Sequence, residues 1–277
     1  MRAQVKVFCF SLMAFFAINL PCIVAAGNIA VKGSSTVLPV VQAEAEAFMK
    51  RYPAINISLS AGGSGDGIKA LIEKSTDIAT SSRELKPEEI SLAQKKGIQP
   101  VLHSIAIDAI VPIVHPANKV SNLTMDQLSQ IYQGRIRNWK DVGGDDLPII
   151  VVSRDSSSGT FESWVELVLH RAKVTPRAQM QASSGAIVQT VSKNKHAIGY
   201  IGMGYLNRAI KPLSVNGAEA TVTTAISGKY PISRHLYMVT NGTPQGDTAS
   251  FIQFILSPAG QKIVEEIGFV PVKASLK

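Results

Sequence analysis

Cysteine is nearly absent from this chain, and aromatic and charged residues are few. The 277 residues include only two cysteines, Cys9 and Cys22, and both stand near the start. If that first stretch is a removed leader, the rest has no thiol for a disulfide, a metal site or a nucleophile. Aromatic residues make up 6% and charged residues 17% of the chain. Stability must therefore come from packing, for which roughly 250 residues are ample.

The first 26 residues have the pattern of a secretory signal peptide. Arg2 and Lys6 precede the apolar run 7–20, which is too short to span a bilayer, and small residues at 24–26 predict cleavage after Ala26. The mature protein would then start at Gly27 and be exported. Lipidation at Cys22 is the alternative, although the preceding proline fits such processing poorly. No second apolar run is long enough to cross a membrane.

The charge balance is basic. Because the leader carries Arg2 and Lys6 and no acid, the formal charge of +8 falls to +6 for residues 27–277. A positive field steers anions toward a protein, but it also serves solubility. Lysines and arginines are scattered along the chain with few aromatic residues between them, which argues against nucleic-acid binding.

Strand-like and helix-like segments alternate along the chain. Strands are predicted at 29–31, 55–60, 77–79, 108–115 (interrupted by a proline), 149–153, 197–202 and 232–240, and helices at 38–52, from 68, at 124–132, from 161 and at 251–266. This alternation predicts an α/β fold with a mostly parallel sheet covered on both faces.

Two of the predicted strands, 108–115 and 232–240, are interpreted as crossings between two lobes. We therefore expect lobe I at 27–112 plus 231–277 and lobe II at 113–230, each a sheet flanked by helices. Clefts between such lobes bind ligands and close by hinge motion.

Four loops combine Ser, Thr, Gly or Arg with a strand-to-helix transition, at 33–36, 62–65, 80–83 and 154–160. The first N–H groups of a helix are unpaired at its positive end and favour an oxyanion. Glycine allows close approach, hydroxyls donate, and an arginine fork matches two oxygens of a tetrahedral anion. Each loop alone is an ordinary cap or turn, but the set favours one shared anion site.

Enzyme, metal and cofactor motifs are weak. Ser64 lies in Gly62-Gly63-Ser64-Gly65-Asp66, which lacks the final glycine of a Gly-x-Ser-x-Gly elbow. The five histidines are far apart, and neither a Walker loop nor a complete Gly-x-Gly-x-x-Gly motif is present. We expect no cofactor and no metal. A secreted phosphatase using a serine of the anion site stays as an alternative, without an identifiable general base.

These loops resemble the phosphate-binding protein of bacterial phosphate-specific ABC transporters, a periplasmic substrate-binding protein family. The matching pieces are 33–39, 62–68, 77–83, Asn138-Trp139 with 142–144, and 153–160. The resemblance implies a type II periplasmic-binding-protein fold and a periplasmic, non-enzymatic protein. It would capture inorganic phosphate and deliver it to a membrane ABC transporter permease. We expect a monomer.

The resemblance also implies a set of phosphate-binding residues. They are Ser35, Thr36, the Val37 amide, Ser64, Ser82, Arg154, Ser158, Gly159 and Thr160. Arg83 suits either an ion pair with Glu84 or a position at the cleft rim. Trp139 and Trp164 are expected in the core.

One position departs from the family pattern. Ser82 stands where better-known members have an Asp that accepts the proton of hydrogen phosphate. Sulfate has no such proton, so an acceptor here decides selectivity. Ser82 can itself accept a hydrogen bond, and Asp66 or Asp155 can assist. Sulfate or molybdate therefore remain alternative ligands.

Overall fold

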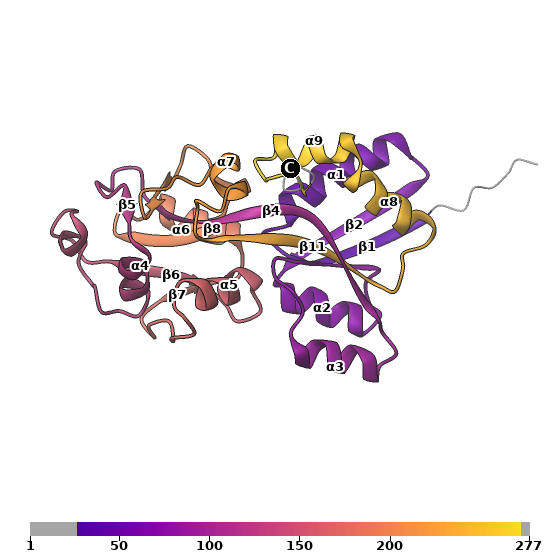
Figure 1. Ribbon diagram of the computed structural model, residues 1–277, viewed down its shortest axis with the longest axis horizontal. Coiled ribbons are helices and arrows are strands. Elements are labelled where there is room, and N and C mark those ends of the chain that lie inside the picture. Colours follow the sequence, from indigo (N-terminus) through magenta and orange to yellow (C-terminus); the bar gives the residue numbers. More distant parts are fainter. Residues whose placement is uncertain (1–26, 273–277) are drawn as a thin grey trace, which may run out of the picture.

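The chain forms two lobes joined by two long strands (Figure 1). The computed structural model describes residues 27–272, so the predicted leader and its cleavage site lie outside the described residues. Within 27–272, no helix has both the length and the apolar character needed to span a bilayer.

Lobe I contains the first strands and helices together with the C-terminal helices. Its elements are β1 (Gly27–Ser34), α1 (Leu38–Arg51), β2 (Ile55–Gly62), α2 (Ser64–Ile72), β3 (Ile78–Ser81), α3 (Pro87–Lys95), α8 (Gly246–Leu256) and α9 (Pro258–Glu266). Lobe II holds β5 (Asn122–Leu123), α4 (Met125–Tyr132), η1 (Trp139–Val142), β6 (Ile150–Arg154), α5 (Gly159–Leu167), β7 (Gln179–Gln181), α6 (Ser184–Ser192), β8 (Ala197–Gly202), η2 (Met203–Tyr205), β9 (Lys211–Pro212), β10 (Ser214–Val215) and α7 (Val222–Ile226). The crossing strands are β4 (Pro100–Val114) and β11 (Ser233–Asn241).

The crossing strands tie both lobes into one sheet, in the order β2-β1-β3-β11-β4-β8-β6-β7. β1 is parallel to β2 and β3, and β6 is parallel to β7 and β8. β4 pairs with β11 up to Ala109 and with β8 from Ile110 onward. The predicted crossings are therefore confirmed, and the lobes can rotate about strands that run through both.

The predicted break at Pro112 is wrong. β4 continues through it, with Pro112 paired in register with Tyr200 and its carbonyl accepting a 2.9 Å bond from the Leu213 amide. Proline removes only a donor from a strand, and its carbonyl still pairs. β4 also starts at Pro100, eight residues before the predicted segment.

Two helices begin earlier than predicted, and both begin inside the anion loops. α2 starts at Ser64 instead of near Ile68, with Gly63 as N-cap, whose amide donates to the Asp66 carboxylate at 2.9 Å. α5 starts at Gly159 instead of Phe161, because the Ser158 hydroxyl caps the Phe161 amide at 3.2 Å. The loop residues are thus the first residues of the helices themselves.

The predicted C-terminal helix 251–266 is two helices. Ser257 ends α8 and caps α9, with its hydroxyl accepting from the Gly260 amide, and Pro258 takes the first position of α9. Three further α-helices, α3, α6 and α7, were not predicted.

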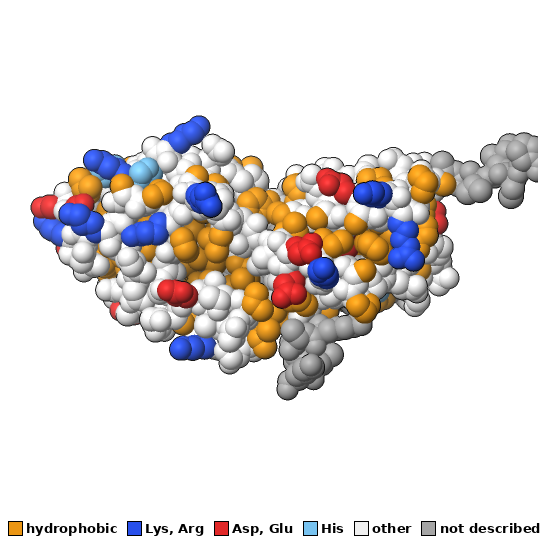
Figure 2. Space-filling model, turned by 90° about the horizontal axis from the view of Figure 1, so that it is seen from above, with side chains coloured by type: hydrophobic (Ala, Val, Ile, Leu, Met, Phe, Trp, Pro, Cys, Tyr) orange, Lys and Arg blue, Asp and Glu red, His pale blue; other side chains and the backbone are white. Residues whose placement is uncertain are grey.

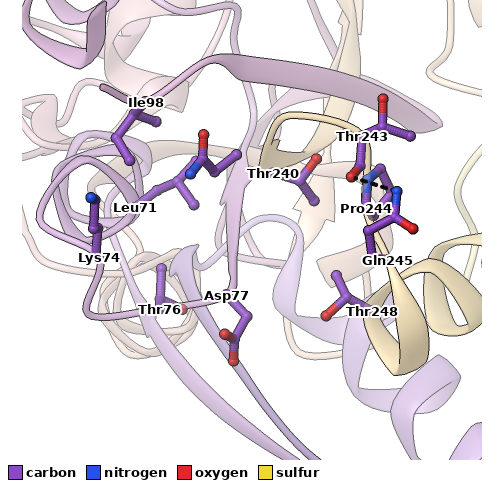
Figure 3. Close-up of a pocket in the computed structure, with 11 residues that line it drawn as sticks. Leu71, Lys74, Thr76, Asp77, Ile98, Thr240, Thr243, Pro244, Gln245 and Thr248 are labelled. Carbon is purple, nitrogen blue, oxygen red and sulfur yellow. Dashed lines mark hydrogen bonds between the residues drawn. The ribbon is translucent and has the colours of Figure 1, made fainter. Parts of the chain in front are cut away.

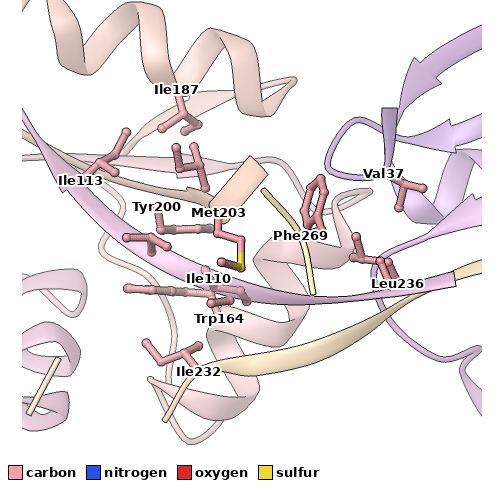
Figure 4. Packing of buried hydrophobic residues seen from close by; sticks show 14 of the residues in the cluster. Val37, Ile110, Ile113, Trp164, Ile187, Tyr200, Met203, Ile232, Leu236 and Phe269 are labelled. Atoms are coloured by element: carbon pink, nitrogen blue, oxygen red, sulfur yellow. The ribbon is translucent and has the colours of Figure 1, made fainter. Parts of the chain in front are cut away.

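The hydrophobic core follows β4 from one lobe into the other (Figure 4). Trp139 and Trp164 are buried, as expected. The Trp164 ring stacks on Tyr200 with centroids 4.3 Å apart and planes at 6°. Neither indole is therefore a platform for a ligand, and their packing stabilises the sheet of lobe II.

One acid is buried without a partner. Glu44 on α1 is fully buried, and neither carboxyl oxygen has a hydrogen-bond partner within residues 27–272. Burial raises the pKa of Glu44 from 4.5 to about 8, because the charged form loses its hydration. Glu44 is therefore protonated at neutral pH.

This carboxyl should make stability depend on pH. Between about pH 4.5 and 8 the native state holds a proton that the unfolded chain has released, so the free energy of unfolding falls as the pH rises. Replacing Glu44 by Gln should flatten that dependence. Urea unfolding at several pH values between about 5 and 8 measures it, with Glu46→Gln on the exposed face of the same helix as control. An unchanged slope in the Glu44 variant would contradict this assignment.

Candidate functional site

The four predicted loops meet between the lobes. Thr36 Oγ1 of lobe I lies 2.8 Å from Thr160 Oγ1 of lobe II. The Gly65 amide donates across the same boundary to the Ser157 carbonyl at 3.0 Å. These contacts place the lobes in a closed arrangement.

The second and third loops face the start of α5. The Ser82 amide donates to Ser64 Oγ at 3.0 Å, and the two hydroxyl oxygens are 3.3 Å apart. A methyl group on Gly159 would lie 2.4 Å from Ser64 Oγ and 2.7 Å from Ser82 Oγ. The absence of a side chain at Gly159 is therefore what lets the loops from the two lobes approach one another.

Arg154, at the end of β6, is 1% exposed. Its Nε donates to the Gln181 carbonyl at 3.0 Å, Nη2 to the Ala182 carbonyl at 2.9 Å and Nη1 to Ser184 Oγ at 3.3 Å. No carboxylate of residues 27–272 forms an ion pair with it. Burial lowers the pKa of Arg154. A buried cation without a counterion is costly, and an anion at this place would offset that cost.

Five hydroxyls of the interlobe cluster share one property: each accepts a hydrogen bond from a protein N–H, and that bond does not use the hydroxyl's own proton. The donors to them are the Ser184 amide for Ser35, the Ser82 amide for Ser64, the Phe161 amide for Ser158, Arg234 for Thr160 and Arg154 for Ser184. Such a set is suited to an acceptor-only ligand such as an ionised oxyanion.

The N-terminus of α5 adds backbone donors. Gly159 and Thr160 are its first two residues, so their amides have no carbonyl four residues back within the helix. Both residues are buried. Free amides and the helix dipole at this end favour negative charge.

The Val37 amide is engaged differently from the other predicted donors. It donates to the Ser34 carbonyl at 3.1 Å and forms part of the turn before α1. Contact of the Val37 amide with an anion stays a prediction. It would require this N–H to share its hydrogen between the Ser34 carbonyl and the anion. The other eight predicted residues lie in the interlobe cluster.

Sequence reasoning missed three residues of the cluster. Ser184 begins α6 and contacts both Thr36 and Arg154. Its signal was present, because Ser183-Ser184-Gly185 precedes an apolar run just as in the four chosen loops. Asp108 and Arg234 stand on the crossing strands and form a buried ion pair of 3.0 Å. The sequence signal for that pair was an acidic residue in one predicted crossing strand and a basic residue in the other.

Asp108 and Arg234 support the site through the contact of Arg234 with Thr160. Arg234 Nη2 donates to Thr160 Oγ1 at 2.8 Å, and Asp108 Oδ1 accepts from the Met203 amide at 2.9 Å. Burial raises the pKa of Asp108, and the pair with Arg234 counteracts this only in part. Because Arg234 can only donate, the Thr160 proton must point elsewhere, toward Thr36 or a ligand.

The two acids proposed as helpers are committed to their own loops. Asp66 accepts from the Gly63 amide, and Asp155 accepts from the Ser157 amide at 2.9 Å and hydroxyl at 2.6 Å. Both therefore act as caps of their loops. Each acid uses one carboxylate oxygen in these bonds, so both acids stay acceptors alongside the Ser82 hydroxyl.

Not every hollow on the surface involves these loops. One of about 380 Å³ on lobe I lies between the end of α2 and the start of α8 and has a single cation, Lys74, in its lining (Figure 3). On the face seen in Figure 2, Lys and Arg side chains are denser over lobe II than over lobe I. On this face the basic side chains are thus unevenly spread, while Arg154 is buried between the lobes.

Comparison with known proteins agrees with this architecture. Residues 24–259 match the model of the PBP superfamily domain. The phosphate-binding protein PstS of Borreliella burgdorferi is 38% identical over 261 residues, covering 88% of this chain and 90% of that protein. The PstS of Bacillus subtilis is 32% identical, covering 90% and 82%.

A solved structure has the same fold. It is a putative phosphate ABC transporter substrate-binding protein with bound phosphate from Clostridium perfringens. It is 38% identical, has a TM-score of 0.83, and the match covers 89% of this chain and 100% of that one. The chain therefore belongs to the PBP superfamily and, within it, to the PstS family of phosphate-binding proteins.

Proposed function

We propose that this protein captures inorganic phosphate between its lobes and delivers it to a membrane ABC transporter permease. Ser35, Thr36, Ser64, Ser82, Arg154, Ser158, Gly159 and Thr160 would hold the anion, with Val37 as a further backbone donor. Ser184 joins them as an additional hydroxyl donor.

The single observation that carries the proposal is Arg154, a buried guanidinium without a carboxylate partner among the described residues, which donates to the Ser184 hydroxyl of the interlobe cluster. A tetrahedral anion supplies the missing charge and accepts hydroxyl protons of that cluster. The PstS relatives of similar length support phosphate as that anion.

The proposal includes how the molecule is organised and where it acts. Lobe I would comprise 27–112 and 231–277 and lobe II 113–230, hinged near the point where β4 changes partner at Ala109 and Ile110. Cleavage after Ala26 would release a monomer into the periplasm. Closure around phosphate would be the state that the permease recognises.

An esterase or phosphatase reaction receives no support from the arrangement. The serines of the site are bonded to amides, to arginines and to one another, and no histidine or free carboxylate contacts them among residues 27–272. A serine nucleophile needs an adjacent general base. The protein is accordingly proposed to bind and not to convert its ligand.

Calorimetric titration tests the ligand. We expect purified residues 27–277 to bind phosphate at one site and to bind sulfate and molybdate more weakly, because phosphate alone brings a proton for Ser82 to accept. Equal or tighter binding of sulfate would refute phosphate selectivity. No heat with any of the three anions would refute the oxyanion site itself.

A further inference from the structure

A cluster of ion pairs joins the lobes at the rim of the site. Arg83 of lobe I reaches Glu162 of lobe II with Nε and Oε2 2.7 Å apart, and Lys86 Nζ lies 3.0 Å from Glu162 Oε1. Glu162 is on α5, which lies at the side of lobe II that faces lobe I (Figure 1). Opening of the lobes would separate these charges.

Arg83 is anchored within its own lobe. Its Nη1 and Nη2 donate to the two carboxylate oxygens of Glu89 at 2.8 and 2.7 Å, and Nη1 also donates to the Glu84 carbonyl at 2.8 Å. Of the two sequence-based alternatives, the rim position is therefore confirmed, whereas the Glu84 carboxylate is not its partner. All these partners belong to lobe I, so opening of the lobes does not require their bonds to Arg83 to break.

The cluster moves with the anion site. Arg83 directly follows Ser82, and Glu162 stands two residues after Thr160 in the first turn of the same helix. Closure that brings Ser82 and Thr160 around a ligand must also bring Arg83 and Glu162 together. Contact at the rim is therefore coupled to enclosure of the anion.

The rim pairs are shielded but remain reachable by water. The Arg83 side chain is 9% exposed and the Glu162 side chain 19%. Surface hollows of about 470 and 310 Å³ lie on either side, and both are lined by Arg83 and Glu84. Pairs this shielded are stronger than free surface pairs, yet they can break without opening the core.

We propose that Glu162, together with Arg83 and Lys86, is a latch that sets how long the closed lobes retain the bound anion. The latch rests on the phosphate-binding function proposed above. It acts after the anion has entered, so it should govern release and leave association nearly unchanged.

Glu162→Gln is the direct test. We expect about three- to tenfold faster phosphate release and a Kd raised by the same factor, with the association rate within about twofold of wild type. Exchange of radiolabelled phosphate measures release, and calorimetry measures Kd. Asp146→Asn, which breaks the exposed Lys140–Asp146 pair inside lobe II, is the matched control and should leave both values unchanged.

A merely structural role would give a different result. Arg83 keeps Glu89 in the Glu162 variant, and Lys86, the cation that loses its partner, has a side chain that is 39% exposed and stays hydrated. Thermal unfolding without phosphate should therefore stay as in wild type. Arg83→Gln and the double variant complete a cycle in which the two effects on release are expected to be less than additive.

The latch is wrong if Glu162→Gln releases phosphate at the wild-type rate, or if the cycle is additive. If the proposed phosphate-binding function were wrong, the result would differ, because wild-type protein would then retain no labelled phosphate at all.

Discussion

Arg154→Met is expected to weaken phosphate binding more than any other single substitution in the site. The guanidinium is the one buried cation there without a carboxylate partner among the described residues, and its Nη1 donates to Ser184 of the hydroxyl cluster. Losing a charge-assisted contact costs about 1.5–3 kcal/mol, or about one to two decades in Kd. Calorimetric titration measures the change.

A matched variant separates site charge from net charge. Arg135→Met removes an exposed arginine from the same lobe, so any loss it causes reflects steering alone. We expect Arg135→Met to bind within about twofold of wild type at physiological salt. An Arg154→Met protein that folds and binds phosphate like wild type would overturn the placement of the anion.

Gly159→Ala should have the next largest effect. The added methyl would meet Ser64 Oγ at 2.4 Å, Ser82 Oγ at 2.7 Å and Ser64 Cβ at 3.0 Å. Those atoms belong to the opposite lobe, so the clash obstructs closure while each lobe can still fold. Overpacking costs about 1–3 kcal/mol, which predicts a loss of roughly 5- to 150-fold in phosphate affinity.

Gly185→Ala serves as the control for that change. Gly185 lies in the first turn of α6, where an added methyl comes no closer than 3.9 Å, to Ser183 Oγ. Alanine is also the better helix former, so binding should be retained. If Gly159→Ala bound phosphate as tightly as Gly185→Ala, close approach of the lobes at Gly159 would not be needed for the ligand.

Site residues could be predicted from the sequence where the local pattern alone indicates an anion-binding group. Hydroxyls and glycines before helix starts identified Ser64, Ser158 and Gly159, because helix termini have unpaired amides wherever they occur. Arg154 stood out inside one of these loops. The first crossing, 108–115, could be predicted as an apolar, β-branched segment.

The missed residues depend on contacts between distant segments. Asp108 and Arg234 pair across β4 and β11, 126 positions apart, and nothing local indicates that the two strands are neighbours. The start of α2 was placed too late because its cap is a glycine, with no side chain to mark it. Arg83 pairs with Glu89, which is close to it in sequence. Its second carboxylate partner, Glu162, comes from the other lobe and could not be identified from the local sequence.

The central claim is that amides and hydroxyls of both lobes enclose one tetrahedral anion against Arg154. A crystal structure of residues 27–277 grown with phosphate tests it most directly. We expect a phosphate in contact with Arg154, the α5 amides and the hydroxyls of Thr36 and Ser64 together. Phosphate bound to one lobe alone, or at a site without Arg154, would contradict it.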